Sequence, residues 1–117
     1  MNTAKCMSLF VLFAAISDGT PYQAIVDAAI LEVLHELKPD ADVSDPRLCY
    51  YAAAVAHLRY MQMLAAKSDI AHTYAGTLAK ENVRTEPCFF AERLVFAYRN
   101  AAADLLIDRN FLFSGIA

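Results

Sequence analysis

The chain has 117 residues, a length that corresponds to one domain with room for a modest core. Its hydrophobic fraction is 58%, above the roughly 45–50% of ordinary soluble domains, and only 20% of its residues are charged. A small domain cannot bury all of that excess, so we expect some of it to promote association with another chain. The formal net charge is -3 with both signs scattered, which argues against the basic stripe of a nucleic-acid-binding protein.

The N-terminal segment combines a single lysine, Lys5, with the apolar run CMSLFVLFAAI. This pattern superficially resembles a short signal peptide, but its basic region is weak and FAAISDG is a poor cleavage site. The run is also too short to span a bilayer. We therefore predict an amphipathic first helix over residues 3–16, and neither a secretion signal nor a membrane span.

The second helix has clear start and stop signals. The turn residues 17–19 end the first helix, and Thr20 as N-cap with Pro21 at the first helical position predicts a helix over 21–37. Its apolar residues recur at the three–four spacing of one buried stripe. Pro39 and a polar loop follow it.

A long third helix is predicted over 45–67 by the run PRLCYYAAAVAHLRYMQMLAAK, with Ser44 or Asp45 as the cap and Pro46 in the first turn. Its alanines let other backbones approach closely, while its tyrosines and methionines supply bulk. A helix that is apolar on most sides must lie at the centre of a small bundle or be completed by another subunit.

The segment 69–86 has poor periodicity and contains Gly76, so it predicts an irregular stretch that could be a loop, a hairpin or a short broken helix. A last helix is predicted over 86–106, with a buried stripe that begins at Phe90. Together these elements predict an all-α protein, a single small bundle of about four to five helices over residues 1–117.

An apolar tail over residues 110–117 contains Phe111, Leu112 and Phe113 in succession. Three large apolar side chains at this place either fold back over the bundle or insert into a neighbouring chain. The irregular segment before the last helix raises the same question, because a long non-helical excursion in a small bundle is often functional.

The histidines do not suggest a metal site. His35, His57 and His72 lack a partner at the spacing of a structural zinc site. Glu32 and His35 form one Glu-x-x-His element of the kind found in di-iron bundles, but no second copy exists. We therefore predict no bound metal and interpret Glu32 as a surface residue beside a half-buried histidine.

The cysteines do not suggest catalysis. Cys6, Cys49 and Cys88 are odd in number and widely spaced, which predicts free thiols in a reducing compartment. Cys49 and His57 are eight positions apart on one helix, more than two turns, so they cannot hydrogen-bond directly. The few glycines are spread along the chain and form no phosphate-binding loop. We predict that the chain is not an enzyme and has no cofactor.

The order of these segments carries a resemblance to a known family. A Ser-Asp-Gly turn precedes the helix AIVDAAILEVLHELKP, and a DPRL cap opens the helix CYYAAAVAHLRYMQMLAA. A variable segment with a single glycine and a last helix with the ending FLFSGI complete the order. Over about residues 9–116 this order resembles the small head–tail connector proteins (adaptor or head-completion proteins) of long-tailed bacteriophages and prophages.

The resemblance implies a structural virion protein whose subunits form a ring under the portal and link the capsid to the tail. The partners would be further copies of the chain, the portal and a tail or stopper protein. The protein would be found in the cytoplasm of the bacterial host and in the virion. Residues 69–86 would form an arm and 110–117 a docking tail. The candidate interface residues are then Tyr74, Gly76, Thr77, Phe111, Leu112 and Phe113.

A second interpretation is a small helical module that binds a ligand or regulates another protein. It predicts a closed apolar pocket between the second, third and last helices, lined by Tyr51, Val55 and Tyr98. At helical spacing the same residues also serve as ordinary core.

Overall fold

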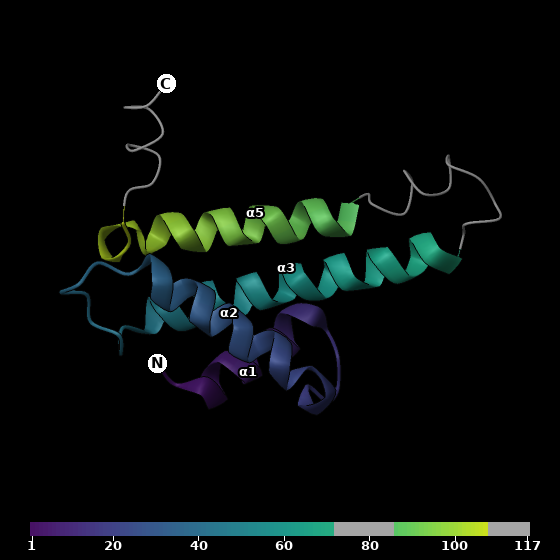
Figure 1. Cartoon of the computed structure of the whole chain (residues 1–117), viewed down its shortest axis with the longest axis horizontal. Helices are drawn as coiled ribbons and strands as arrows, with labels where there is room; N and C mark the ends of the chain where they lie inside the picture. The colour runs from purple at the N-terminus through teal and green to yellow at the C-terminus, as the bar shows by residue number, and fades with distance from the viewer. Residues whose placement is uncertain (72–85, 108–117) are drawn as a thin grey trace, which may run out of the picture.

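A computed structural model of the protein describes residues 1–71 and 86–107 (Figure 1). In these two ranges the backbone forms four α-helices and two short 3-10 helices, with no strand beyond one isolated bridge. The predicted all-α fold is therefore confirmed.

The first helix, α1 (Thr3–Ala14), begins where the side chain of Asn2 accepts a hydrogen bond of 3.1 Å from the Lys5 backbone N–H. It ends two residues earlier than predicted. Ala15 adopts the left-handed conformation with φ 55°, and its N–H donates to the carbonyl of Leu12. A residue in this conformation satisfies the last carbonyls of a helix and ends it.

The second helix starts later than predicted. Residues 20–22 form the 3-10 helix η1 (Thr20–Tyr22), and α2 spans Gln23–Glu36. Thr20 is not the N-cap, because its N–H and its hydroxyl both donate to the carboxylate of Asp18, at 3.0 and 2.7 Å. The predicted apolar stripe does face the core, with buried side chains at Val26, Ala29, Ile30 and Val33.

The third helix, α3 (Pro46–Ala71), starts as predicted and runs four residues further. The Asp45 carboxylate accepts a 2.9 Å hydrogen bond from the Arg47 N–H, so Asp45 caps the helix and Pro46 occupies its first position. No glycine or proline interrupts the sequence after Pro46 until Gly76, which leaves the helix free to extend past residue 67.

The last long helix, α5 (Glu86–Ala101), ends before the predicted boundary at residue 106. The 3-10 helix η3 (Ala103–Leu105) follows, and Leu106 then forms an isolated bridge with Leu37, just after α2. Two backbone hydrogen bonds of 3.0 and 2.8 Å hold this bridge. The α-helix stops here because the chain leaves it to pair with the end of α2.

The face of α5 that packs on α3 differs in part from the prediction, although Ala102 is buried and Tyr98 half-buried as expected. Phe90, expected to begin the buried stripe, is 62% exposed, whereas Ala91 is completely buried. The alanines of α3 from Ala52 to Ala54 are buried as well. Small buried side chains allow close helix packing, and a phenylalanine in the place of Ala91 would not fit without a shift of its neighbours.

The helices form layers around α3. In Figure 1, α5 runs along one side of α3, and α1 and α2 lie along the other side. The rings of Phe10, Tyr22 and Tyr60 meet edge to face between these helices, with centroids 4.9 to 6.3 Å apart. This arrangement supports the expectation that α3 is the central helix.

Among the described residues, only part of α3 has helices on both sides. It has 26 residues, whereas α1 and α2 have 12 and 14, so they can line only about half of its length. Tyr60 is the last buried side chain described in α3, and 61–67 are all partly or fully exposed. We call residues 61–67 and 88–96 the uncovered half, and residues 1–60 and 97–107 the covered half.

Candidate functional site

Three phenylalanines on α5 point away from the core of the bundle. Phe89, Phe90 and Phe96 are 63%, 62% and 68% exposed. Phe89 and Phe96 are separated by two helical turns and share one face, on which Glu92 and Arg93 lie between them. We call Phe89, Glu92, Arg93 and Phe96 the aromatic stripe. Large apolar side chains gathered on one exposed element are typical of an interaction surface.

The aromatic stripe borders a cavity of about 490 Å³ between α5 and α3. Besides the stripe, Leu58 of α3 and Val95 of α5 line it. Its wall is thus mainly aromatic and aliphatic, with one carboxylate and one guanidinium from the stripe. Such a wall suits an apolar protein side chain with charged neighbours.

A second, charged cavity of about 400 Å³ adjoins the first, because Leu58 and Val95 contribute to both. It is open and lies where α2, α3 and α5 meet. Its lining residues are Glu32, His35, Glu36, Tyr51, Val55, Leu58, Arg59, Val95 and Arg99.

Glu36 joins all three helices in the charged cavity. The Tyr51 hydroxyl of α3 donates to Glu36 Oε2 at 2.6 Å, and Arg99 Nη1 of α5 lies 3.3 Å from Glu36 Oε1. Burial and the hydrogen bond to the Glu36 carboxylate raise the pKa of Tyr51, in that order of size. The phenol therefore stays protonated and acts as a hydrogen-bond donor.

Arg59 and Glu32 form a second link between α3 and α2. Arg59 Nη2 lies 2.7 Å from Glu32 Oε1, and Arg59 Nη1 donates to the side chain of Gln62 at 3.1 Å. The hydrogen bond with Glu32 raises the pKa of Arg59. Glu32 is thus an ion-pair partner that helps to hold the helices together, as Glu36 is.

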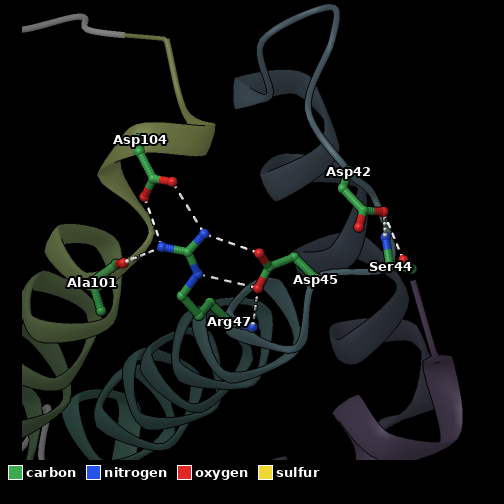
Figure 2. A network of polar contacts seen from close by, with 6 residues as sticks. All are labelled: Asp42, Ser44, Asp45, Arg47, Ala101 and Asp104. Carbon is green, nitrogen blue, oxygen red and sulfur yellow. Dashed lines mark hydrogen bonds and ion pairs between the residues drawn. The ribbon is translucent and has the colours of Figure 1, made fainter.

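Arg47 ties the start of α3 to the end of α5 (Figure 2). Its guanidinium makes two hydrogen bonds to Asp45, at 2.9 and 3.1 Å, and two to Asp104, at 2.7 and 3.1 Å. A fifth goes to the Ala101 carbonyl at 3.0 Å. These bonds use all five donors of the side chain. Arg47 therefore acts as a clamp that sets the position of α5, and with it the aromatic stripe.

The loop before α3 is held by its own side chains. The carboxylate of Asp42 accepts hydrogen bonds from the backbone N–H and the hydroxyl of Ser44, at 2.9 and 2.6 Å (Figure 2). The carboxylate of the neighbouring Asp45 accepts hydrogen bonds from Arg47. Within residues 1–71 and 86–107 no group of three or more metal-binding side chains comes together.

Two cysteines are core residues, and Cys88 and His57 are half-buried. Cys6 and Cys49 are buried, and burial together with the neighbouring Cys49 raises the pKa of Cys6 to about 12. The thiol is therefore a poor nucleophile at neutral pH. His57 contacts the ring of Phe13, with centroids 6.5 Å apart, and burial lowers its pKa. Its Nδ1 is buried without a hydrogen-bond partner.

The apolar pocket predicted from Tyr51, Val55 and Tyr98 differs from what these residues form. Tyr51 and Val55 line the open, charged cavity. Tyr98 instead stacks on the rings of Phe13 and Tyr50, with centroids 5.8 and 5.5 Å apart. It packs α5 against α1 and α3 and has no place in that cavity.

The interface residues expected from the sequence are Tyr74, Gly76, Thr77, Phe111, Leu112 and Phe113, and all six lie outside the described residues. The aromatic stripe was not expected. The seven-residue spacing of Phe89 and Phe96 was the available signal, but periodicity alone does not tell which side of a helix meets the core.

Comparison with known proteins identifies no relative. No family model, curated protein or solved structure matches the chain. Among the helices that the structure describes, none combines the length and the apolar character needed to cross a membrane.

Proposed function

We propose that this protein is a non-enzymatic assembly subunit that binds other protein chains through the exposed face of α5. The observation that carries the proposal is the set of three exposed phenylalanines on the uncovered half. Complete burial of one such side chain contributes roughly 1.5–3 kcal/mol. Aromatic side chains in the centre of an interface also supply much of its binding energy.

The specific role that we propose is the one implied by the resemblance, a head–tail connector subunit of a phage or prophage. Such subunits would form a ring on the portal and offer a surface to a tail or stopper protein. An all-α bundle with an apolar external face supports this role, since ring subunits need lateral contacts. The net charge of -3 also suits a channel in which DNA must slide without binding.

The polar contacts of the charged cavity support a structural role for its residues. Arg59 and Arg99 are each engaged by a glutamate from α2, and the Tyr51 hydroxyl donates to one of the same glutamates. These groups hold the three helices in register. They therefore keep the adjoining aromatic stripe in a fixed position, as a docking surface requires.

Light scattering coupled to size exclusion, over a wide concentration series, tests the proposal. We expect the mass of the wild-type protein to rise with concentration, and the double variant Phe89→Ser/Phe96→Ser to stay smaller. The matched control is Leu12→Ser/Leu31→Ser, which removes two exposed apolar side chains from the covered half. It should behave as the wild type does.

A wild-type protein that stays monomeric at every concentration would overturn the proposal. Electron microscopy of the largest species tests the specific role, which requires closed rings. A chain truncated before Asn110 tests separately whether the apolar tail contributes to association.

A further inference from the structure

About its midpoint the aromatic stripe is symmetric in size and opposite in charge. From the midpoint between Glu92 and Arg93, the next stripe residues are Phe89 on one side and Phe96 on the other, at equal distances along the helix. An apolar residue therefore flanks a central pair of opposite charges at both ends. All four side chains are exposed.

Two antiparallel helices with this stripe match each other. If a two-fold axis passes between Glu92 and Arg93, Phe89 of one copy faces Phe96 of the other. The same operation sets Glu92 of each copy against Arg93 of the other, so two such ion pairs form. Each aromatic ring then meets a ring and each charge meets its opposite, the pattern that a self-complementary two-fold interface requires.

Among residues 1–71 and 86–107, the packing of α5 leaves this face exposed. The side chains of α5 that pack toward α3, among them Ala91, Val95 and Tyr98, are buried or half-buried. They lie roughly half a turn around the helix from Phe89 and Phe96. A second α5 can therefore approach the stripe without displacing α3.

We propose that the chain forms a two-fold dimer in which α5 pairs antiparallel with α5 of a second copy, centred between Glu92 and Arg93. The inference rests on the proposed function, because it uses the same face for association, and it names a second copy as the partner. A two-fold contact closes on itself and makes no ring, so the rings of the proposed function would need a second, lateral contact besides this one. The dimer is thus the form in which the free protein keeps its aromatic stripe covered until another protein competes for it.

Charge reversal tests the arrangement. In Glu92→Arg homodimers both central pairs become positive, and in Arg93→Glu homodimers both become negative, so each variant should dimerise at least about tenfold more weakly than the wild type. An equimolar mixture of the two variants restores both pairs and should recover the dimer. The double variant Glu92→Arg/Arg93→Glu should also dimerise. Asp40→Arg, an equal change in charge at an exposed loop residue, is the control and should leave the dimer intact.

The outcomes separate this inference from the proposed function. Recovery of the dimer on mixing means that position 92 of one chain faces position 93 of the other, and it supports the two-fold arrangement. Oligomers that both single variants leave unchanged, or that mixing fails to restore, overturn the dimer but retain association as the function. A wild-type protein that is monomeric throughout overturns both. Circular dichroism of each variant verifies that it is folded, and the mixture provides an internal check, since unfolded chains would not pair.

Discussion

The covered and uncovered halves use the same residue types in opposite ways. In the covered half Phe10 is completely buried between the rings of Tyr22 and Tyr60, whereas in the uncovered half Phe96 is 68% exposed. The difference is the number of helix layers around α3. Where α1 and α2 lie opposite α5, aromatic rings form a core. Where α3 and α5 are the only described helices, the aromatic rings of α5 are exposed. The same excess of apolar residues therefore forms a core in one half and an exposed apolar surface in the other.

The largest difference in stability between the two halves should come from truncating one phenylalanine to alanine in each. Phe10→Ala removes a ring packed on all sides and should lower the free energy of unfolding by about 3–5 kcal/mol. Phe96→Ala should change it by less than about 0.5 kcal/mol in the monomer. Urea unfolding at low protein concentration measures both. A large loss in Phe96→Ala would mean that this ring is covered within a single chain, and the division into two halves would be wrong.

A smaller difference in stability is expected when an alanine of α3 is enlarged to leucine in each half. Ala53 is completely buried, so Ala53→Leu should overpack the helix contacts and cost about 1–3 kcal/mol. Ala66 is exposed in the uncovered half, and Ala66→Leu should stay within about 0.5 kcal/mol of the wild type. Thermal unfolding of the two variants side by side makes the comparison. Equal losses would show that the second half of α3 is as crowded as the first.

The Arg47 clamp should have a moderate effect that depends on pH. Its guanidinium lowers the pKa of Asp45 and of Asp104 below the usual 3.8, so their stabilising contribution is present above that pH and is lost as the pH falls through the lower folded values. Arg47→Ala should lower the melting temperature less than Ala53→Leu does, and should flatten the acid dependence below about pH 4. Arg47→Lys is the control that keeps the positive charge but lacks the planar guanidinium group. An unchanged acid profile in Arg47→Ala would contradict the clamp.

The smallest expected effect concerns His57. Burial lowers its pKa below 6.5, so on acidification the unfolded chain takes up the proton first. Wild-type stability should therefore fall as the pH drops from about 6.5 toward the lower folded pKa of this half-buried ring. His57→Asn should lack this part of the slope, since its side chain does not titrate. Denaturant midpoints between neutral and mildly acidic pH measure it, and identical slopes would exclude the effect.

Local patterns in the sequence were sufficient for the helices and for much of the core. The apolar stripe of α2 is buried as its spacing predicts, and Asp45 with Pro46 opens α3. These features depend on residues within a few positions of each other, so one turn of helix contains the information needed to predict them. The errors at the ends of α1 and α2 are also local, because several groups compete for one cap. At Thr20 the competing carboxylate is that of Asp18.

Contacts between distant residues could not be predicted in this way. Arg47 and Asp104 are 57 positions apart, and the Glu36 carboxylate is shared by Tyr51 of α3 and Arg99 of α5. Each of these residues alone has the pattern of an ordinary exposed charge or core tyrosine. Only the packing of α5 on α3 brings them within hydrogen-bonding distance.

The amino-acid sequence by itself determined that this protein is helical, that α3 is long and apolar on most sides, and that some apolar surface must remain. The tertiary structure decided where that surface lies. On α5 the periodicity fits a buried stripe through Phe90 as well as one through Ala91, and the packing of α5 in the bundle buries the alanine. That packing turns Phe89 and Phe96 outward, because side chains on one side of a helix are buried only at the expense of those on the other.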